Sequence, residues 1–192
     1  MGGVFDILGV KNLIHQADHH ILRAVLIDKL DELIRSLDSP PVEYGQLKYL
    51  IFSDTFVIFG PNFQSYGWFL STCKNLIDKS IYIQLPLRGA ISTGSTFTST
   101  DPPVVLGPAF VEAHEYCEDQ DWIGLLLTPS AISELRKKNL EPLRHDFVSD
   151  KQIPLRVKSS TEVVAYRFQN GSANFDSPFL SRLHQMKRSA PK

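Results

Sequence analysis

Hydrophobic and polar residues alternate along this chain in blocks that predict both helices and strands. Apolar residues recur at three- and four-residue steps over several segments, which is typical of amphipathic helices: 11–37, 66–81, 107–118 and 130–138. Short apolar runs bounded by turn residues predict strands at 4–8, 47–53, 55–59, 87–92, 122–127, 153–158 and 163–168. Residues 93–103 are rich in Ser, Thr, Gly and Pro and predict a loop or a short irregular hairpin.

The order of these elements indicates the fold class and the domain organisation. They follow one another as β, α, β, β, α, β, α, β, α, β, β, which predicts an α+β sandwich on a ferredoxin-like core, with an antiparallel or mixed sheet. No internal repeat or linker divides the chain, and 192 residues fit one domain with a sizeable core. We expect this domain to span residues 1–169, and the polar residues 170–192 to form a mobile tail.

Composition and charge exclude several classes of protein. With 20 Lys and Arg against 21 Asp and Glu, the chain has a net charge of −1 and lacks the basic field of a duplex-binding protein. No apolar run approaches the ~20 residues of a membrane helix, and the first residues carry neither a secretion nor a lipidation signal. We therefore expect a cytoplasmic protein without nucleic-acid or membrane partners. Cys73 and Cys117 are far apart in sequence and predict two reduced thiols.

Two carboxylates occur where an apolar strand would otherwise exclude them. Asp6 interrupts the first predicted strand, and Asp54 lies at the tip of the central hairpin. A charge in such a position costs several kcal/mol unless it is paired or binds a metal. In a ferredoxin-like sheet the two side chains can converge at one edge, where they would suit a hard divalent cation such as Mg²⁺ or Mn²⁺. Asp54 is explained equally well as a turn-capping residue, whereas Asp6 is harder to explain in that way.

The turn after the first strand is a candidate phosphate site. Gly9, Val10 and Lys11 lead into the predicted helix, whose first backbone N–H groups favour anions, and Lys11 adds a positive charge. The chain has no Gly-x-x-x-x-Gly-Lys phosphate loop, no dinucleotide-binding glycine pattern and no serine nucleophile elbow. Any phosphate chemistry must therefore use another arrangement.

Blocks of sequence with the order and spacing of a known family extend over roughly residues 4–168. They are Phe5-Asp6-Ile7-Leu8-Gly9-Val10, Ser53-Asp54-Thr55-Phe56, Leu87-Arg88-Gly89-Ala90-Ile91-Ser92-Thr93-Gly94 and Gly107-Pro108-Ala109-Phe110-Val111-Glu112-Ala113. They resemble, in turn, the first strand, the hairpin turn, the fourth strand and the following helix of class III nucleotide cyclases. The resemblance implies the class III nucleotide cyclase fold.

The same resemblance implies an activity and a set of ligands. Members of this family bind a nucleoside triphosphate at the interface of a head-to-tail homodimer. Two Mn²⁺ or Mg²⁺ ions then drive attack of the ribose 3′-OH on the α-phosphate, with loss of pyrophosphate. Carried over to this chain, Asp6 and Asp54 would hold both ions as catalytic residues, and the carbonyl of Ile7 would complete one coordination shell.

The chain departs from the purine-specific members of the family. Leu50 and Val104 stand at approximately the positions of a Lys and an Asp that read the purine edge, and Val111 and Glu115 replace an Asn and an Arg that act in the transition state. Loss of these residues while both aspartates remain resembles the bacterial cyclases of the Pycsar anti-phage system. That resemblance implies a uridylate or cytidylate cyclase, with UTP preferred over CTP, whose cyclic product activates an effector.

Two other interpretations remain open. Because Val111 and Glu115 replace the transition-state pair, the chain could be a catalytically silent cyclase-like domain that binds a nucleotide or a partner. It could also be a ferredoxin-like protein without any nucleotide role. A nucleotide-dependent gain in thermal stability separates the first of these from the second, since only a ligand that binds the native state stabilises it.

The other residues that could contact a substrate can also be explained by a purely structural role. Arg88 lies on an apolar strand and either points into the site or pairs with a carboxylate. Lys158 or Arg156 stands where the family keeps a phosphate-binding Lys. Phe5 and Tyr49 could contact the base or ribose, although a Phe in a core strand is more often part of the core.

Overall fold

The computed structural model of this chain describes residues 1–9, 19–35, 37, 47–60, 66–100, 103–140, 153, 155–156 and 163–166. Helices and strands alternate along these residues much as the sequence predicts. In chain order the elements are β1 (Gly2–Ile7), α2 (His19–Arg35), β2 (Lys48–Phe52), β3 (Thr55–Phe59), α3 (Tyr66–Tyr82), β4 (Leu87–Ser92), β5 (Phe97–Thr100), β6 (Pro103–Leu106), α4 (Pro108–Glu118), β7 (Gly124–Leu127), α5 (Pro129–Lys137) and β8 (Val164–Tyr166).

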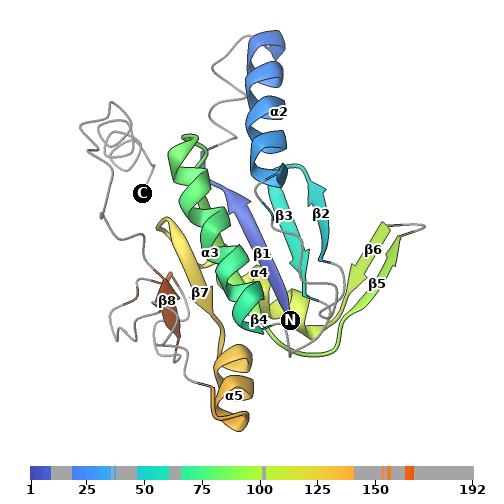
Figure 1. The fold of residues 1–192 in the computed structure, drawn as a ribbon, viewed down its shortest axis with the longest axis vertical. Helices are drawn as coiled ribbons and strands as arrows, with labels where there is room; N and C mark the ends of the chain where they lie inside the picture. Colours follow the sequence, from blue (N-terminus) through green and yellow to red (C-terminus); the bar gives the residue numbers. More distant parts are fainter. Residues whose placement is uncertain are drawn as a thin grey trace.

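The main sheet has the strand order β2-β3-β1-β4-β7-β8. Figure 1 shows β1 in its middle, where it pairs antiparallel with both β3 and β4. The pair β4 and β7 is parallel, and the remaining pairs of this sheet are antiparallel. The predicted α+β fold with a mixed sheet is therefore confirmed.

Alternation along the strands divides the core between the two faces of the sheet. On one face, Phe5 and Ile58 pack with residues of α3, α5 and Leu33 of α2. On the other face, Val4 and Val57 pack with Ala113, Tyr116 and Cys117 of α4. Figure 1 shows α3 in front of the sheet and α4 behind it. We call the second of these the α4 face.

A tight turn at Ser53-Asp54 joins β2 to β3, as predicted. Ser53 has a φ of 57°, in the left-handed region, which two-residue hairpin turns commonly require so that their twist matches that of the strands. Residues 93–103, predicted as a loop or irregular hairpin, include β5 and part of the two-stranded β5–β6 ribbon. This ribbon stands apart from the main sheet in Figure 1.

Some predicted elements are shorter in the structure or lie partly outside the described residues. The strand predicted at 153–158 is described only in part, and within it Leu155 forms an isolated bridge with Gln120. The helix predicted from residue 11 is described from His19 onward. The expected domain end at 169 and the tail 170–192 lie outside the described residues. None of the helices in the described part of the chain has the length and apolar character needed to cross a membrane.

Candidate metal and nucleotide site

One row of paired residues crosses the sheet at the end of β1. Phe52 of β2 is opposite Thr55 of β3, Thr55 is opposite Asp6, Asp6 is opposite Arg88 of β4, and Arg88 is opposite Gly124 of β7. Residues opposite one another in a sheet share a face, and Asp6 lies two positions after Val4, so the row belongs to the α4 face. The site predicted around Asp6 is therefore on this face.

The hairpin turn is attached directly to the end of β1. The backbone N–H of Ile7 donates a hydrogen bond of 2.9 Å to the carbonyl oxygen of Asp54. This bond brings Asp54 next to Asp6, and repulsion from the Asp54 carboxylate is among the causes that raise the pKa of Asp6. The two aspartates therefore converge at one edge of the sheet.

Arg88 is the direct partner of Asp6. Its Nε and Nη2 atoms donate hydrogen bonds of 3.0 and 2.7 Å to Oδ2 of Asp6. Its Nη1 donates to the carbonyls of Glu118, at 3.2 Å, and Gln120, at 2.7 Å, where α4 ends. A helix C-terminus favours a positive charge. Of the two alternatives in the sequence, pairing with a carboxylate is the one seen here.

Burial is the main cause of the shift in the pKa of Asp6. Partial removal from water disfavours the charged form and raises the pKa of this carboxyl group above its ordinary value. The hydrogen bonds and charge of Arg88 act in the opposite direction, while the negative charges of Asp54 and Glu118 add to the increase. A cation that brought additional positive charge would therefore favour the ionised form of Asp6.

The donor set at this edge fits a hard divalent cation. Within the described residues, Oδ1 of Asp6 and the side chain of Asp54 accept no hydrogen bond, so both keep oxygens available. Carboxylate and carbonyl oxygens are the ligands that Mg²⁺ and Mn²⁺ prefer. No group of three or more His, Cys, Asp or Glu side chains in the described ranges forms a metal cluster, so a cation here would need oxygens from a substrate or water as well.

The other residues predicted to contact a substrate lie in several different settings. Phe5 has no exposed surface and lies in the core, so it cannot touch a ligand in this conformation. Tyr49 is 43% exposed, but it is opposite Ile58 and so lies on the face away from Asp6. Gly9 has a φ of 84° in the turn after β1. Val10, Lys11 and Lys158 lie outside the described residues.

Arg156, the alternative phosphate ligand, is already paired. Its Nε donates a hydrogen bond of 2.7 Å to Oδ1 of Asp121, and its backbone N–H donates to the carbonyl of Asp119. Both side chains of the Arg156–Asp121 pair are more than half exposed. This pair is therefore in contact with water, where an ion pair contributes little to stability and can exchange partners.

The positions that depart from the purine cyclases are apolar or exposed. Leu50 lies on the same face of the sheet as Asp6 and is a partly buried residue that packs against the core on that face. Val104 is a half-buried residue of β6. Val111 is 53% exposed on α4, and Glu115, four residues later, is also exposed. An apolar side chain at 50 and 104 offers no donor or acceptor to a base.

Sequence reasoning missed Phe52 and Gln120. Phe52 is 83% exposed in the same row as Asp6, and its only signal was its place directly before the Ser53-Asp54 turn. Gln120 is fully buried and donates hydrogen bonds to the carbonyls of Gly89 and Tyr116. A lone Gln between a helix and a strand gives no sequence signal of such a role.

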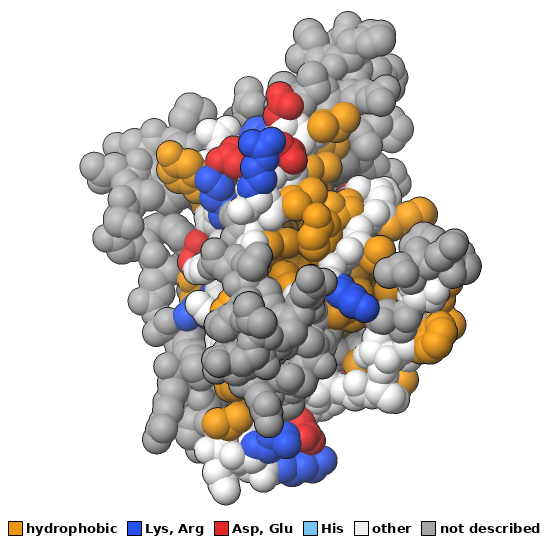
Figure 2. Space-filling model, turned by 45° about the vertical axis from the view of Figure 1, so that its right-hand side comes forward, with side chains coloured by type: hydrophobic (Ala, Val, Ile, Leu, Met, Phe, Trp, Pro, Cys, Tyr) orange, Lys and Arg blue, Asp and Glu red, His pale blue; other side chains and the backbone are white. Residues whose placement is uncertain are grey.

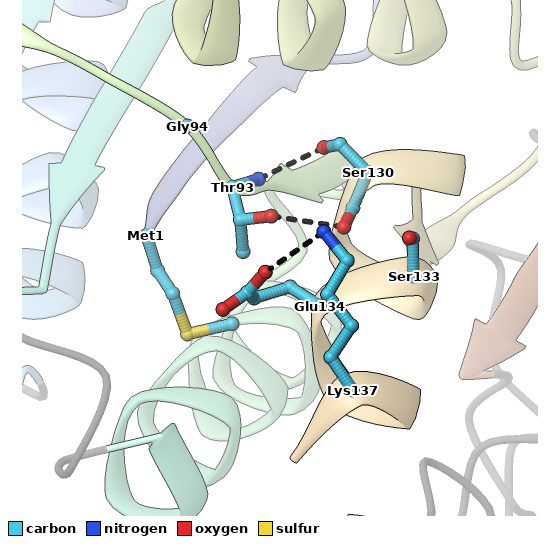
Figure 3. A pocket seen from close by; sticks show the side chains of 7 residues that line it. All are labelled: Met1, Thr93, Gly94, Ser130, Ser133, Glu134 and Lys137. Atoms are coloured by element: carbon cyan, nitrogen blue, oxygen red, sulfur yellow. Dashed lines mark hydrogen bonds and ion pairs between the residues drawn. The ribbon is translucent and has the colours of Figure 1, made fainter.

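A separate hollow lies at the opposite end of β1 and β4. It measures about 540 Å³, and Figure 3 shows its lining residues: Met1, Thr93, Gly94, Ser130, Ser133, Glu134 and Lys137. Lys137 pairs with Glu134 at 3.5 Å, and Thr93 donates two hydrogen bonds to Ser130, from its backbone N–H to Oγ and from its hydroxyl to the carbonyl oxygen. Since none of the candidate residues lines it, this hollow is distinct from the Asp6 edge.

Hydrophobic side chains gather on one side of the surface in Figure 2, where β2 and the β5–β6 ribbon lie. The large exposed apolar residues of these strands are Tyr49, Phe52, Phe97 and Leu106. Phe97 and Leu106 are opposite one another in the ribbon.

Comparison with known proteins identifies the fold. No protein-family model matches the chain, and no curated protein does. Among solved structures, the adenylyl cyclase CyaB from P. aeruginosa superposes with a TM-score of 0.61 at 15% identity, covering 90% of this chain and 95% of that one. The guanylate cyclase domain of RhGC from Catenaria anguillulae, in complex with GTP, gives 0.58 at 8% identity, covering 88% and 95%.

A third similar structure is the monomeric guanylyl cyclase domain of the RhoGC fusion protein from Blastocladiella emersonii. Its TM-score is 0.58 at 11% identity, and the match covers 86% of this chain and 92% of that one. At such low identities the likeness concerns the backbone arrangement. The chain has the fold of class III nucleotide cyclase catalytic domains.

Proposed function

We propose that this protein is a metal-dependent nucleotide cyclase. The observation that carries the proposal is the convergence of Asp6 and Asp54 at one edge of a cyclase-type sheet, where Ile7 donates its N–H to the Asp54 carbonyl at 2.9 Å. Both aspartates are partly buried, which is unusual for an ordinary surface charge. Two carboxylates next to a backbone carbonyl match the ligand preference of Mg²⁺ and Mn²⁺.

The proposed roles follow from these positions. Asp6 and Asp54 would hold the two cations, and the Ile7 carbonyl would add an oxygen to one of them. The bound cations would lower the pKa of the attacking 3′-hydroxyl and neutralise charge on the phosphates. Gly9, Val10 and Lys11 would contact the triphosphate as the chain leaves β1, together with Lys158. Tyr49 lies on the other face of its own sheet and would reach a base only across a homodimer interface.

We propose a pyrimidine nucleoside triphosphate as the substrate, with UTP preferred over CTP. Leu50 lies on the same face of the sheet as Asp6, and Val104 lies on the β5–β6 ribbon. Neither has polar atoms with which to read the edge of a purine. The cyclic product would then act as a second messenger in anti-phage defence, as the resemblance to the Pycsar cyclases implies.

A direct assay tests the proposal. The purified protein is incubated with each of the four nucleoside triphosphates and Mn²⁺, and cyclic monophosphate and pyrophosphate are measured. We expect product from UTP above all. Asp54→Asn should reduce the rate by about a thousandfold, because loss of a metal ligand removes several kcal/mol of transition-state stabilisation. Asp28→Asn, which changes an exposed carboxylate on α2, is the matched control and should keep the wild-type rate.

A catalytically silent nucleotide-binding domain is the second candidate. Val111 and Glu115 are exposed on α4 and offer no cation to a developing negative charge. In that case UTP with Mn²⁺ would raise the melting temperature, by an amount equivalent to about 2.7 kcal/mol at a hundredfold excess over Kd, without any cyclic product. Absence of both product and stabilisation with every triphosphate would contradict both candidates.

A further inference from the structure

We propose that the hollow between the end of β4 and α5 is a second ligand site, which binds a small phosphorylated sugar. In this assignment Lys137 and Ser133 bind the phosphate, and Glu134 and Thr93 bind the sugar hydroxyls. The inference goes beyond the proposed function, because none of these residues belongs to the Asp6 edge of the sheet.

One face of α5 forms a wall of this hollow. Ser130, Ser133, Glu134 and Lys137 follow one another at steps of one, three or four positions along α5, so they lie on one side of the helix. Thr93, directly after β4, donates two hydrogen bonds to Ser130 across the hollow's edge. In Figure 3 the polar ends of Thr93, Glu134 and Lys137 point toward one another. Polar groups from two elements therefore converge on a space of about 540 Å³, which is within the usual range of small-molecule sites.

Hydrogen bonds within the protein hold part of this wall in place. Oγ of Ser130 accepts the backbone N–H of Thr93 at 3.0 Å and lies 3.2 Å from Oγ1 of the buried Thr128. The backbone N–H of Ser130 donates to Oε1 of Glu112 on α4, also at 3.2 Å. Groups that are fixed before binding lose little conformational freedom when a ligand arrives. The hollow therefore has a preformed wall.

Glu112 also decides where in the hollow an anion binds. Its carboxylate accepts a hydrogen bond from the first turn of α5, where the helix dipole favours negative charge. A second anion at the same turn would be repelled by Glu112. An anionic group is therefore directed to the other end of the wall, where Lys137 supplies a positive charge.

Lys137 is available to such an anion. Its side chain is 69% exposed, and its Nζ lies 3.5 Å from Oε2 of Glu134, which is long for a charge-assisted hydrogen bond. Lys138 approaches the other oxygen of Glu134, Oε1, at 3.8 Å. Glu134 therefore keeps a cation nearby when Lys137 turns to a phosphate, and exchange of an exposed ion pair costs little.

The other polar groups of the hollow favour a ligand that also carries hydroxyls. Oγ of Ser133 makes no hydrogen bond within the described part of the chain, so it can donate one to a phosphate oxygen. The carboxylate of Glu134 only accepts hydrogen bonds, and carboxylates commonly bind sugar hydroxyls in this way. The hydroxyl of Thr93 donates to Ser130 but can still accept. Phosphate alone would meet the negative charge of Glu134, and a sugar alone would leave Lys137 unused.

Nuclear magnetic resonance of the full chain tests the inference, with ribose 5-phosphate as the probe and no added metal ion. We expect the backbone amide resonances of Gly94 and Ser133 to shift, and that of Ile7, at the Asp6 edge, to stay in place. Ribose and inorganic phosphate, each added alone, should bind at least about tenfold more weakly, because each loses a set of polar contacts. Absence of shifts at Gly94 and Ser133 with ribose 5-phosphate would overturn the inference.

Substitutions on α5 test the assigned contacts. Lys137→Gln removes the positive charge at an exposed position and should weaken binding of ribose 5-phosphate about tenfold, as expected for loss of a charge-assisted hydrogen bond. Ser133→Ala should weaken it as well. Arg35→Gln is the matched control, since Arg35 is an exposed helix cation that pairs with Asp31 one turn earlier, and it should bind as the wild type does. Equal affinity of K137Q and the wild type would overturn the inference.

A further titration with UMP distinguishes two sources of a phosphorylated sugar. Tighter binding of UMP than of ribose 5-phosphate, with shifts at Gly94 and Ser133, supports the inference with a nucleotide as the ligand. Equal or weaker binding of UMP at these amides supports it with a free sugar phosphate. The probes contain neither a triphosphate nor a metal ion, so failure of this inference leaves the proposed function untouched.

Discussion

Gly89 lies directly over the ring of Phe5, so that a Cβ atom at this position would come within 2.4 Å of Cδ1 of Phe5. The two residues are opposite one another in the β1–β4 pair. Phe5 directly precedes Asp6, and Gly89 directly follows Arg88. Phe5 is fully buried. The absence of a side chain at 89 therefore allows the ring to fill the core directly beneath the candidate site.

Gly89→Ala should destabilise the protein by about 1–3 kcal/mol, because the added methyl group overpacks a rigid core. Urea unfolding measures the change. Gly2→Ala is the matched control on the neighbouring strand β1, since a Cβ there would meet nothing within 4 Å. Equal stability of the two variants would show that the Phe5 ring can move aside.

Ser53→Gly should stabilise the protein by about 1 kcal/mol. Ser53 has a φ of 57°, and the left-handed conformation costs a residue with a side chain roughly 1–2 kcal/mol, part of which glycine regains. Thermal unfolding measures the shift. Ser95→Gly, at an exposed position without a positive φ, should give no stabilisation, and a gain there as large as at 53 would contradict the explanation.

Asp78→Asn should make stability less dependent on pH. Burial raises the pKa of Asp78, while the Tyr166 hydroxyl, 2.8 Å from both carboxylate oxygens, and the charge of Lys74 oppose the shift. A carboxyl group whose pKa rises on folding stabilises the protein below its unfolded pKa of about 3.9 and loses that contribution as pH rises through the folded pKa. We therefore expect the variant to gain stability relative to the wild type between about pH 3 and pH 7.

Unfolding curves recorded at about pH 3 and at about pH 7 measure the stability of the wild type and of Asp78→Asn. The asparagine keeps a carbonyl that accepts the Tyr166 hydrogen bond, so the comparison isolates the charge. Asp28→Asn, at an exposed position, is the control and should not change the pH dependence. A relative gain that is larger at about pH 3 than at pH 7 would have the wrong sign for this explanation.

Cys73 and Cys117 should react with thiol reagents only after unfolding. Both are free and buried, and burial raises the pKa of Cys117 to about 12 and that of Cys73 above its ordinary range. Since the thiolate is the reactive form, we expect Ellman's reagent at about pH 8 to label the native protein roughly a hundredfold more slowly than the urea-unfolded protein. Rapid labelling of the native protein would indicate local opening around α3 or α4.

Much of the fold could be predicted because it depends on local patterns. The hairpin, the boundaries of β4, and helices α3 and α4 follow from apolar periodicity and from Pro and Gly positions. For the β5–β6 ribbon the sequence predicts only a loop or a short irregular hairpin, because its Ser- and Thr-rich residues show little apolar alternation. For the site, an aspartate in an apolar strand identified Asp6, but no local pattern shows that Tyr49 lies on the face away from it.

The sequence by itself determined that Asp6 needed a partner, because a charge inside an apolar strand is costly in any fold. Only the tertiary structure decided what that partner is. Asp6 and Arg88 are separated by 82 positions, and their meeting depends on the register of β1 against β4 and on where α4 ends. Register is a property of paired strands, so no single strand's sequence contains it.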